Sequence, residues 1–211
     1  MKKNKKTTGI LAAILIVLVV IVAAIIIVFS VRGKKSTEST TETIDAAGKH
    51  HVEIQVKNYG TIKVELDGDT APITVANFLK LAQNGFYDGL TFHRIIDGFM
   101  IQGGDPKGNG TGGSDETIKG EFSGNGVENN ISHVRGTISM ARSQDMDSAS
   151  SQFFIVQSDC TYLDGQYAAF GTVTEGMELV DKICKDTPVQ DNNGTVSAAD
   201  QPVIESIKVI D

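Results

Sequence analysis

The chain has 211 residues, enough for one domain of ordinary size with additional segments. Residues 1–35 hold seven of the 19 Lys and Arg residues and none of the 26 acidic residues, which leaves 36–211 with 12 basic and 26 acidic residues and a formal charge of −14. Nucleic-acid binding requires a basic surface, so the composition excludes a nucleic-acid partner.

The first predicted element is a membrane-spanning helix over residues 10–29, a run without charge, proline or polar side chains. At about 1.5 Å per residue it spans roughly 30 Å, the thickness of a bilayer core. The run is longer than a signal-peptide core and no small-residue cleavage site follows, which favours an uncleaved signal anchor over a cleaved signal. A buried globular helix is the weakest alternative, since every face is apolar.

Four lysines before the span predict that residues 1–9 stay in the cytoplasm and that the large domain is exported. The expected location is therefore the cell membrane, with a single pass and the domain outside the cytoplasm. Residues 30–48 are predicted to be a flexible linker, because 36–48 are rich in Ser, Thr and Glu and contain Ile44 as their only large apolar side chain.

The folded domain is predicted over 49–211 and begins with a hairpin. Apolar and polar residues alternate on both sides of a turn at 58–60, which indicates two strands with one buried face. The apolar positions are Val52, Ile54, Val56, Ile62, Val64 and Leu66.

A helix is predicted to follow from Pro72, with Asp69 or Thr70 as its cap and Gly85 at its end. Between residues 85 and 171 the apolar runs are short and glycine is frequent, which is typical of strands joined by tight or long loops.

A second helix is predicted over 177–185, with Val180, Ile183 and Cys184 on its buried face, and a last strand after Pro202. Many strands with two helices predict a mainly β domain, closed or nearly closed and capped by the helices. Two cysteines, Cys160 and Cys184, are too few for a disulfide framework; free thiols are favoured, and one bridge between them is the alternative.

Several segments of this domain resemble cyclophilin-type peptidyl-prolyl cis/trans isomerases, in the order of that family. They are NFLKLAQNGFYDGLTFHRIIDGFMIQGGDP, GTGG, GTISMAR, SQFFI and YLDGQYAAFG. The resemblance covers about residues 52–210. It implies a closed eight-stranded antiparallel β-barrel capped by two α-helices, and an enzyme that needs no metal or other cofactor.

The chemistry of that family explains the residue types. Resonance gives the peptide bond a rotation barrier of about 18–20 kcal/mol, and at the twisted transition state the proline nitrogen becomes a hydrogen-bond acceptor. A guanidinium aimed at this nitrogen binds the twisted amide better than the planar one and lowers the barrier. The resemblance assigns this role to Arg94, with Gln102 binding the substrate backbone and orienting the arginine; alone, either would be an ordinary strand residue.

The resemblance also implies an apolar slot for the proline ring, formed by Phe99, Met100, Phe154 and Leu163. The alternative is that these side chains are simply core, and Phe153 is the better candidate for pure core. Further positions match the family's substrate-contacting segments: Gly110, Ala141, Arg142 and Gln152.

Arg142 stands where many relatives have asparagine. Two positions depart from the best-known relatives: Tyr162 stands in place of tryptophan, and Tyr167 stands in place of histidine. In the family, the indole that Tyr162 replaces is tied to cyclosporin binding. We therefore expect weakened cyclosporin sensitivity with activity retained.

The resulting hypothesis is a membrane-anchored, monomeric bacterial isomerase that acts on proline-containing, unfolded or exported polypeptides. A module that binds proline-containing peptides or acts as a chaperone with little turnover is the alternative. The two tyrosines leave that alternative open, whereas Arg94 and Gln102 argue against it. A cleaved, secreted enzyme is a third possibility.

Overall fold

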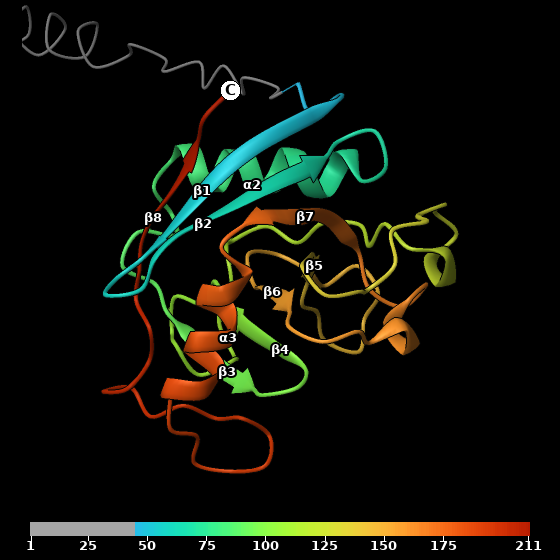
Figure 1. Cartoon of the computed structure of the whole chain (residues 1–211). Helices are drawn as coiled ribbons and strands as arrows, with labels where there is room; N and C mark the ends of the chain where they lie inside the picture. Colours follow the sequence, from blue (N-terminus) through green and yellow to red (C-terminus); the bar gives the residue numbers. More distant parts are fainter. Residues whose placement is uncertain (1–44) are drawn as a thin grey trace, which may run out of the picture. The chain divides into compact units, whose positions relative to one another are not determined.

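The computed structural model describes residues 45–211; the predicted membrane helix at 10–29 and most of the predicted linker lie outside the described residues. The described chain forms eight strands and two α-helices (Figure 1). The strands are β1 (Lys49–Val56), β2 (Gly60–Asp67), β3 (Phe92–Ile96), β4 (Met100–Gly103), β5 (Thr137–Met140), β6 (Phe153–Val156), β7 (Ala169–Glu175) and β8 (Ile204–Val209). The helices are α2 (Pro72–Gln83) and α3 (Met177–Asp186), and short 3-10 helices cover Ser123–Asn125 and Thr161–Leu163.

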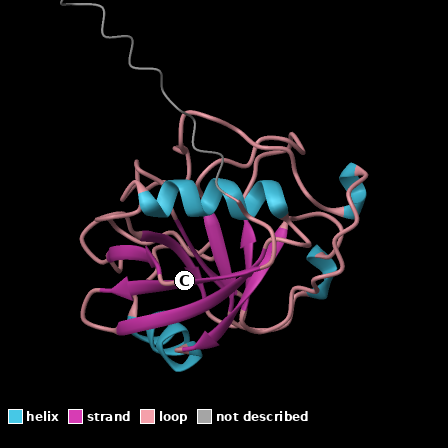
Figure 2. Cartoon of the chain, turned by 90° about the horizontal axis from the view of Figure 1, so that it is seen from above, coloured by secondary structure: helices cyan, strands magenta, loops and turns pink. Residues whose placement is uncertain are grey.

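All strand pairs are antiparallel, in the order β3-β4-β6-β5-β7-β2-β1-β8. Helix α2 lies across one end of the curled sheet and α3 lies at the opposite end (Figure 2). The predicted mainly β class, the eight antiparallel strands and the two helices are confirmed. In the described part of the chain neither helix is both long and apolar enough to cross a bilayer.

The sheet is a curled half-barrel, so the expectation of a fully closed barrel is corrected. Between residues 45 and 211 the edge strands β3 and β8 meet at one isolated bridge, Thr91–Val203. The rest of the β3 edge pairs with a loop: Ile95 N donates to Gly194 O at 2.8 Å and Val196 N donates to His93 O at 3.1 Å. The loop satisfies backbone groups that a closed barrel would pair with β8.

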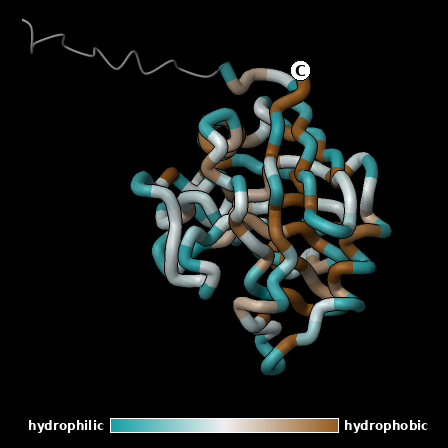
Figure 3. The backbone as a smooth tube through the Cα atoms, turned by 90° about the vertical axis from the view of Figure 1, so that its left-hand side faces the viewer, coloured by the Kyte–Doolittle hydropathy of each residue, from teal (hydrophilic) through white to brown (hydrophobic). Residues whose placement is uncertain are grey.

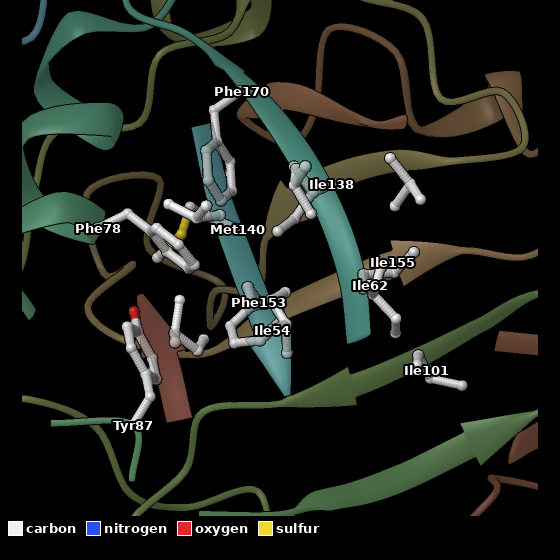
Figure 4. Close-up of a cluster of buried hydrophobic side chains, with 14 of the residues drawn as sticks. Ile54, Ile62, Phe78, Tyr87, Ile101, Ile138, Met140, Phe153, Ile155 and Phe170 are labelled. Atoms are coloured by element: carbon white, nitrogen blue, oxygen red, sulfur yellow. The ribbon is translucent and has the colours of Figure 1, made fainter. Parts of the chain in front are cut away.

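The core follows the alternation of the strands, which Figure 3 shows as alternating hydrophobic and hydrophilic residues along the chain. The six apolar positions of the predicted hairpin are all buried, as expected. Asn58 in the turn has φ 66°, a left-handed conformation that asparagine tolerates. Aromatic residues from distant elements meet in the core (Figure 4): Phe78, Tyr87, Phe153 and Phe170.

The remaining boundary predictions mostly hold. Helix α3 covers the predicted range with one more residue, and Val180, Ile183 and Cys184 are buried as predicted. Cys160 and Cys184 are free thiols, and burial raises the pKa of Cys160 to about 11 and of Cys184 to about 12. The end of the predicted linker packs on the domain, because Ala46 is buried and Gly68 N donates to Gly48 O at 2.8 Å.

The start of α2 differs from the prediction. Pro72 is the first helical residue, but neither Asp69 nor Thr70 caps it: the N-cap is Ala71 and makes no side-chain bond. Instead the buried Glu121, far along the chain, accepts from Ile73 N at 3.0 Å and from Thr74 N at 2.8 Å. A carboxylate here satisfies free helix donors and complements the helix dipole.

Substitution of Glu121 with Gln should lower the free energy of unfolding by about 1–3 kcal/mol, because the amide would turn a donor toward buried helix N–H groups. Urea unfolding measures this change. The matched control is Glu116→Gln, which loses only an exposed ion pair with Lys80 and should cost less than about 0.5 kcal/mol. Equal effects of the two substitutions would contradict the capping role.

Candidate active site

Arg94, Gln102 and Phe154 lie side by side on three neighbouring strands. In the sheet register Arg94 pairs with Gln102, and Gln102 pairs with Phe154. Because successive side chains on a strand alternate between faces, the neighbours Ile101 and Phe153 enter the main core, while this row faces the opposite side of the sheet. A second, smaller apolar cluster therefore forms around Met100 and Phe154.

A β-bulge precedes Arg94. The register shifts between Phe92 and Arg94, so His93 is the additional residue on β3. Bulges occur beside active sites, where they redirect a side chain. Here the bulge lets His93 point into a buried position while Arg94 still lies opposite Gln102.

The Arg94 guanidinium is held from two sides. Its Nη1 donates to Gln102 Oε1 at 3.1 Å, and its Nε donates to the backbone O of Asn193 at 2.9 Å. Its Nη2 is 3.3 Å from Asn193 Oδ1. Burial lowers the pKa of Arg94, while nearby groups including Asp191 act in the opposite direction. An arginine remains charged in a protein, so this is a fixed cation with limited freedom.

A relay of carboxamides orients Gln102. Its Nε2 donates to Gln152 Oε1 at 2.9 Å, and Gln152 Nε2 donates to Gly112 O at 2.7 Å. With the oxygen of Gln102 accepting from Arg94, each amide has one defined orientation. The relay thus connects the cation to the glycine-rich loop and keeps both side chains in place.

Arg94 opens onto a cavity of about 230 Å³ with an apolar floor. Phe154 is 5% exposed, and Tyr167 packs edge-on against it with ring centroids 6.1 Å apart. The cavity combines an apolar surface with one fixed donor group, which suits a small apolar ring bonded to a polar amide. Its lining residues are Arg94, Phe99, Met100, Gln102, Ala141, Arg142, Phe154, Leu163 and Tyr167.

A second, polar cavity of about 360 Å³ adjoins the first and shares Gln102, Ala141 and Arg142 with it. Gly110 and Gln152 line this second cavity. The buried Asp105 holds the glycine-rich loop that carries Gly110: it accepts from Gly110 N at 2.6 Å and from two other backbone amides. Burial acts to raise the pKa of Asp105, but these backbone donors outweigh it and hold the pKa below its usual value.

His133 supports the floor of the apolar cavity. Its ring stacks on Phe154 with centroids 6.0 Å apart. Its Nδ1 lies 2.8 Å from Asp164 Oδ1 and its Nε2 lies 3.0 Å from Ser139 Oγ. Burial lowers the pKa of His133, and the opposing effect of Asp164 is smaller. A neutral ring that donates through Nδ1 and accepts from the hydroxyl satisfies both contacts.

Acidification from about pH 7 to about pH 5.5 should lower the free energy of unfolding. Burial holds the pKa values of His93 and His133 below the value of about 6.5 for an unfolded histidine. Below that pH the unfolded chain binds protons that the folded chain excludes, so this stability is complete above pH 6.5 and is lost as the pH falls toward the folded pKa values.

Urea unfolding over that pH range measures the effect. Replacing His133 with Gln should flatten the dependence in part, and replacing His93 as well should flatten it further. A wild-type unfolding free energy that stays constant between the two pH values would contradict the prediction.

The structure brings most of the predicted site residues together. The predicted catalytic pair and the predicted apolar slot share one cavity, and Phe153 is core, as expected. Tyr162 lines neither cavity: it is 65% exposed and contacts Phe99, with ring centroids 6.1 Å apart. The Ala141 N–H is already bonded to Gln152 O at 2.9 Å, so it is not available to pair with a peptide. The catalytic and binding roles themselves stay predictions.

The sequence patterns did not reveal two residues that support the candidate site. Asn193 holds Arg94 from 99 residues away, and in the sequence it is only part of an Asn-Gly turn. His133 lies beneath Phe154, and no local pattern marks a histidine as the floor of a cavity. Both contacts depend on how loops return to the sheet, which periodicity does not encode.

The chain is similar to known proteins of one family. Residues 51–209 match the family model described as cyclophilin type peptidyl-prolyl cis-trans isomerase/CLD. Peptidyl-prolyl cis-trans isomerase B of Bacillus subtilis is 52% identical over 56% of this chain and 79% of its own length. A probable peptidyl-prolyl cis-trans isomerase of Brucella suis is 41% identical over 79% of this chain and 87% of its own.

A solved structure is also similar. It is a cyclophilin type peptidyl-prolyl cis-trans isomerase of Cryptosporidium parvum, crystallised in the presence of the dipeptide Ala-Pro. Its TM-score is 0.67 and its sequence identity is 32%, over 76% of this chain and 99% of that chain.

Proposed function

We propose that Arg94 accelerates rotation about the X–Pro bond in this chain, which belongs to the cyclophilin-type family of peptidyl-prolyl cis-trans isomerases and is an enzyme of this type. In this mechanism the proline ring enters the apolar cavity and the guanidinium donates a hydrogen bond to the imide nitrogen as the amide twists. The planar amide has its nitrogen lone pair in resonance and accepts poorly, so the bond strengthens toward the transition state.

The observation that carries this proposal is the fixation of Arg94 at the wall of an apolar cavity. Three acceptors on Gln102 and Asn193 hold the guanidinium, so little reorganisation is needed when the amide twists. Phe154 and Met100 supply the apolar surface beside it. No side chain is required to gain or lose a proton, so this step uses positioning and electrostatics alone.

The substrates we propose are exported polypeptides that arrive unfolded. The support is in the sequence: an uninterrupted apolar run at residues 10–29, preceded by lysines and followed by a polar segment. A single-pass anchor would keep the isomerase domain close to the outer face of the membrane. Rotation about X–Pro bonds is slow enough to limit the folding of chains released there.

Two experiments test the proposal. The full chain, purified from membranes in detergent, should accelerate the cis-to-trans conversion of an Ala-Pro peptide. Protease added outside intact cells should remove the domain if it is exported, and alkaline extraction should leave the full chain in the membrane fraction if it is anchored. A chain recovered in the soluble fraction at full length would contradict the anchor, whereas peptide binding without acceleration would contradict the mechanism.

We expect cyclosporin to inhibit the enzyme weakly, with half-inhibition above about 1 µM, because Tyr162 offers a phenol where an indole donor is needed. The Tyr162→Trp variant should bind the drug at least about tenfold more tightly, worth about 1.4 kcal/mol. Inhibition of Ala-Pro isomerisation measures both values. Tyr59→Trp, which changes a tyrosine on the β1–β2 turn, is the control; sub-micromolar inhibition of the wild type would refute the prediction.

A further inference from the structure

Arg142 lies at the boundary between the apolar cavity and the polar cavity and lines both. Its guanidinium carbon is 4.8 Å from the ring centroid of Tyr167 and 5.2 Å from that of Phe122. Its Nε donates to Gln166 O at 3.0 Å and its Nη1 donates to Ser143 O at 2.8 Å. The side chain is therefore held in place, unlike a typical surface arginine.

The charge of Arg142 is not balanced by a carboxylate. None of the ion pairs found in residues 45–211 includes it, and its hydrogen-bond acceptors are backbone carbonyls. The acidic residues closest along the chain are already engaged. Asp147 Oδ1 accepts from Gly120 N at 3.0 Å, and Asp145 Oδ1 accepts from Asp147 N at 2.9 Å. This cation is thus unpaired within a domain of strongly acidic composition.

The polar cavity beside Arg142 contains no acidic side chain among its lining residues. Most of its hydroxyl groups already donate within the chain: Ser143 Oγ to Ser148 Oγ at 2.8 Å, for example, and Ser148 Oγ to Asp145 O at 2.6 Å. Among the described contacts, Nη2 of Arg142 and the hydroxyl of Ser150 have no acceptor. These two donors can therefore bind acceptor atoms of a substrate group that enters the cavity.

We propose that the polar cavity binds an acidic side chain of the substrate close in sequence to the proline, and that Arg142 determines this preference. An ionised carboxylate has only acceptor oxygens, and its bond to a guanidinium is charge-assisted. Glutamine would bring a donor as well, and lysine would bring a third cation beside Arg142 and Arg94. This inference rests on the proposed position of the proline in the adjoining cavity.

The test is a series of peptides assayed with the full chain in detergent. One set carries Glu, Gln or Lys two residues before the proline, and a second set carries them two residues after it. At low salt we expect kcat/KM for the Glu peptide to exceed that for the Lys peptide by about tenfold in one of the two sets. At about 0.5 M salt the ratio should fall severalfold, since the cavity is open to solvent.

Variants assign the preference to the residue. Arg142→Gln should bring the Glu-to-Lys ratio close to one in that set, and Arg142→Lys should keep part of it, because the charge remains while the planar fork is lost. Lys57→Gln removes an exposed positive charge on the β1–β2 turn and should leave the ratio as it is. Circular dichroism of each variant checks that it is folded.

Two results would overturn the inference: a wild-type ratio below about two in both peptide sets, or a ratio that is the same in the wild type and in Arg142→Gln. Failure of the proposed mechanism looks different. In that case Arg94→Ala would retain activity toward every peptide, whatever its charge. The charge ratio and the Arg94 dependence are therefore independent readouts.

Discussion

Replacement of Arg94 with alanine is expected to lower kcat/KM for an Ala-Pro peptide by about 100-fold or more. Loss of one preorganised donor to a transition state typically costs about 2.7–4 kcal/mol in the barrier. The loss should fall mainly on kcat, because the apolar cavity that binds the ring keeps Phe154 and Met100. Protease-coupled or direct spectroscopic isomerisation assays measure both constants.

The Arg94 substitution should leave the fold intact. The side chain is half-buried and is held by Gln102 and Asn193 at the edge of the sheet, outside the main core. Arg94→Lys gives a graded comparison, since an ammonium cannot reproduce the planar fork that reaches both partners. Lys57→Gln again serves as the control for loss of charge. Retention of more than about a fifth of kcat/KM in a folded Arg94→Ala variant would contradict the mechanism.

The adjacent pair Phe153 and Phe154 should give opposite phenotypes. Phe153 is fully buried and packs edge-on against Phe78 and Tyr87, with ring centroids 5.5 and 5.6 Å apart. Phe153→Ala should therefore cost about 3–5 kcal/mol of unfolding free energy. Phe154 faces the cavity, so Phe154→Ala should lower kcat/KM by at least about tenfold, chiefly by raising KM, at a smaller cost in stability.

Urea unfolding and peptide kinetics on the same preparations separate the two effects. Where Phe153→Ala does not fold, Phe153→Leu provides a milder version, and Phe154→Leu is its partner. Because the two positions are consecutive on β6 and chemically identical, each is the control for the other. For each variant, the fall in kcat/KM is divided by the fall in unfolding free energy. If this ratio is the same for both variants, Phe154 is only a core residue and the prediction is contradicted.

Local patterns predicted the elements well. The hairpin follows from alternation at residues such as Val52 and Ile54, and α3 follows from the spacing of Val180, Ile183 and Cys184. Both signals are short-range, because the period of a strand or helix brings apolar residues to one face whatever surrounds it. The segment around Arg94 likewise marked the candidate site through residues that are close in sequence.

Predictions that needed distant partners were the ones that failed. The cap of α2 was expected from Asp69 or Thr70, but it comes from Glu121. A closed barrel was expected, but the loop carrying Gly194 pairs with the free edge of β3. The cap had been assigned by a local rule and the closed barrel by the family resemblance, and in both cases a long-range contact satisfies the backbone groups instead.

The sequence by itself determined the fold class, the family and the neighbourhood of the site, because these depend on residue type and spacing within short segments. Only the tertiary structure decided how Asn193 holds Arg94, how Arg142 stacks between Tyr167 and Phe122, and that His133 supports Phe154. Such contacts arise when loops far apart in the chain return to one face of the sheet, and their geometry depends on the packing of the whole domain.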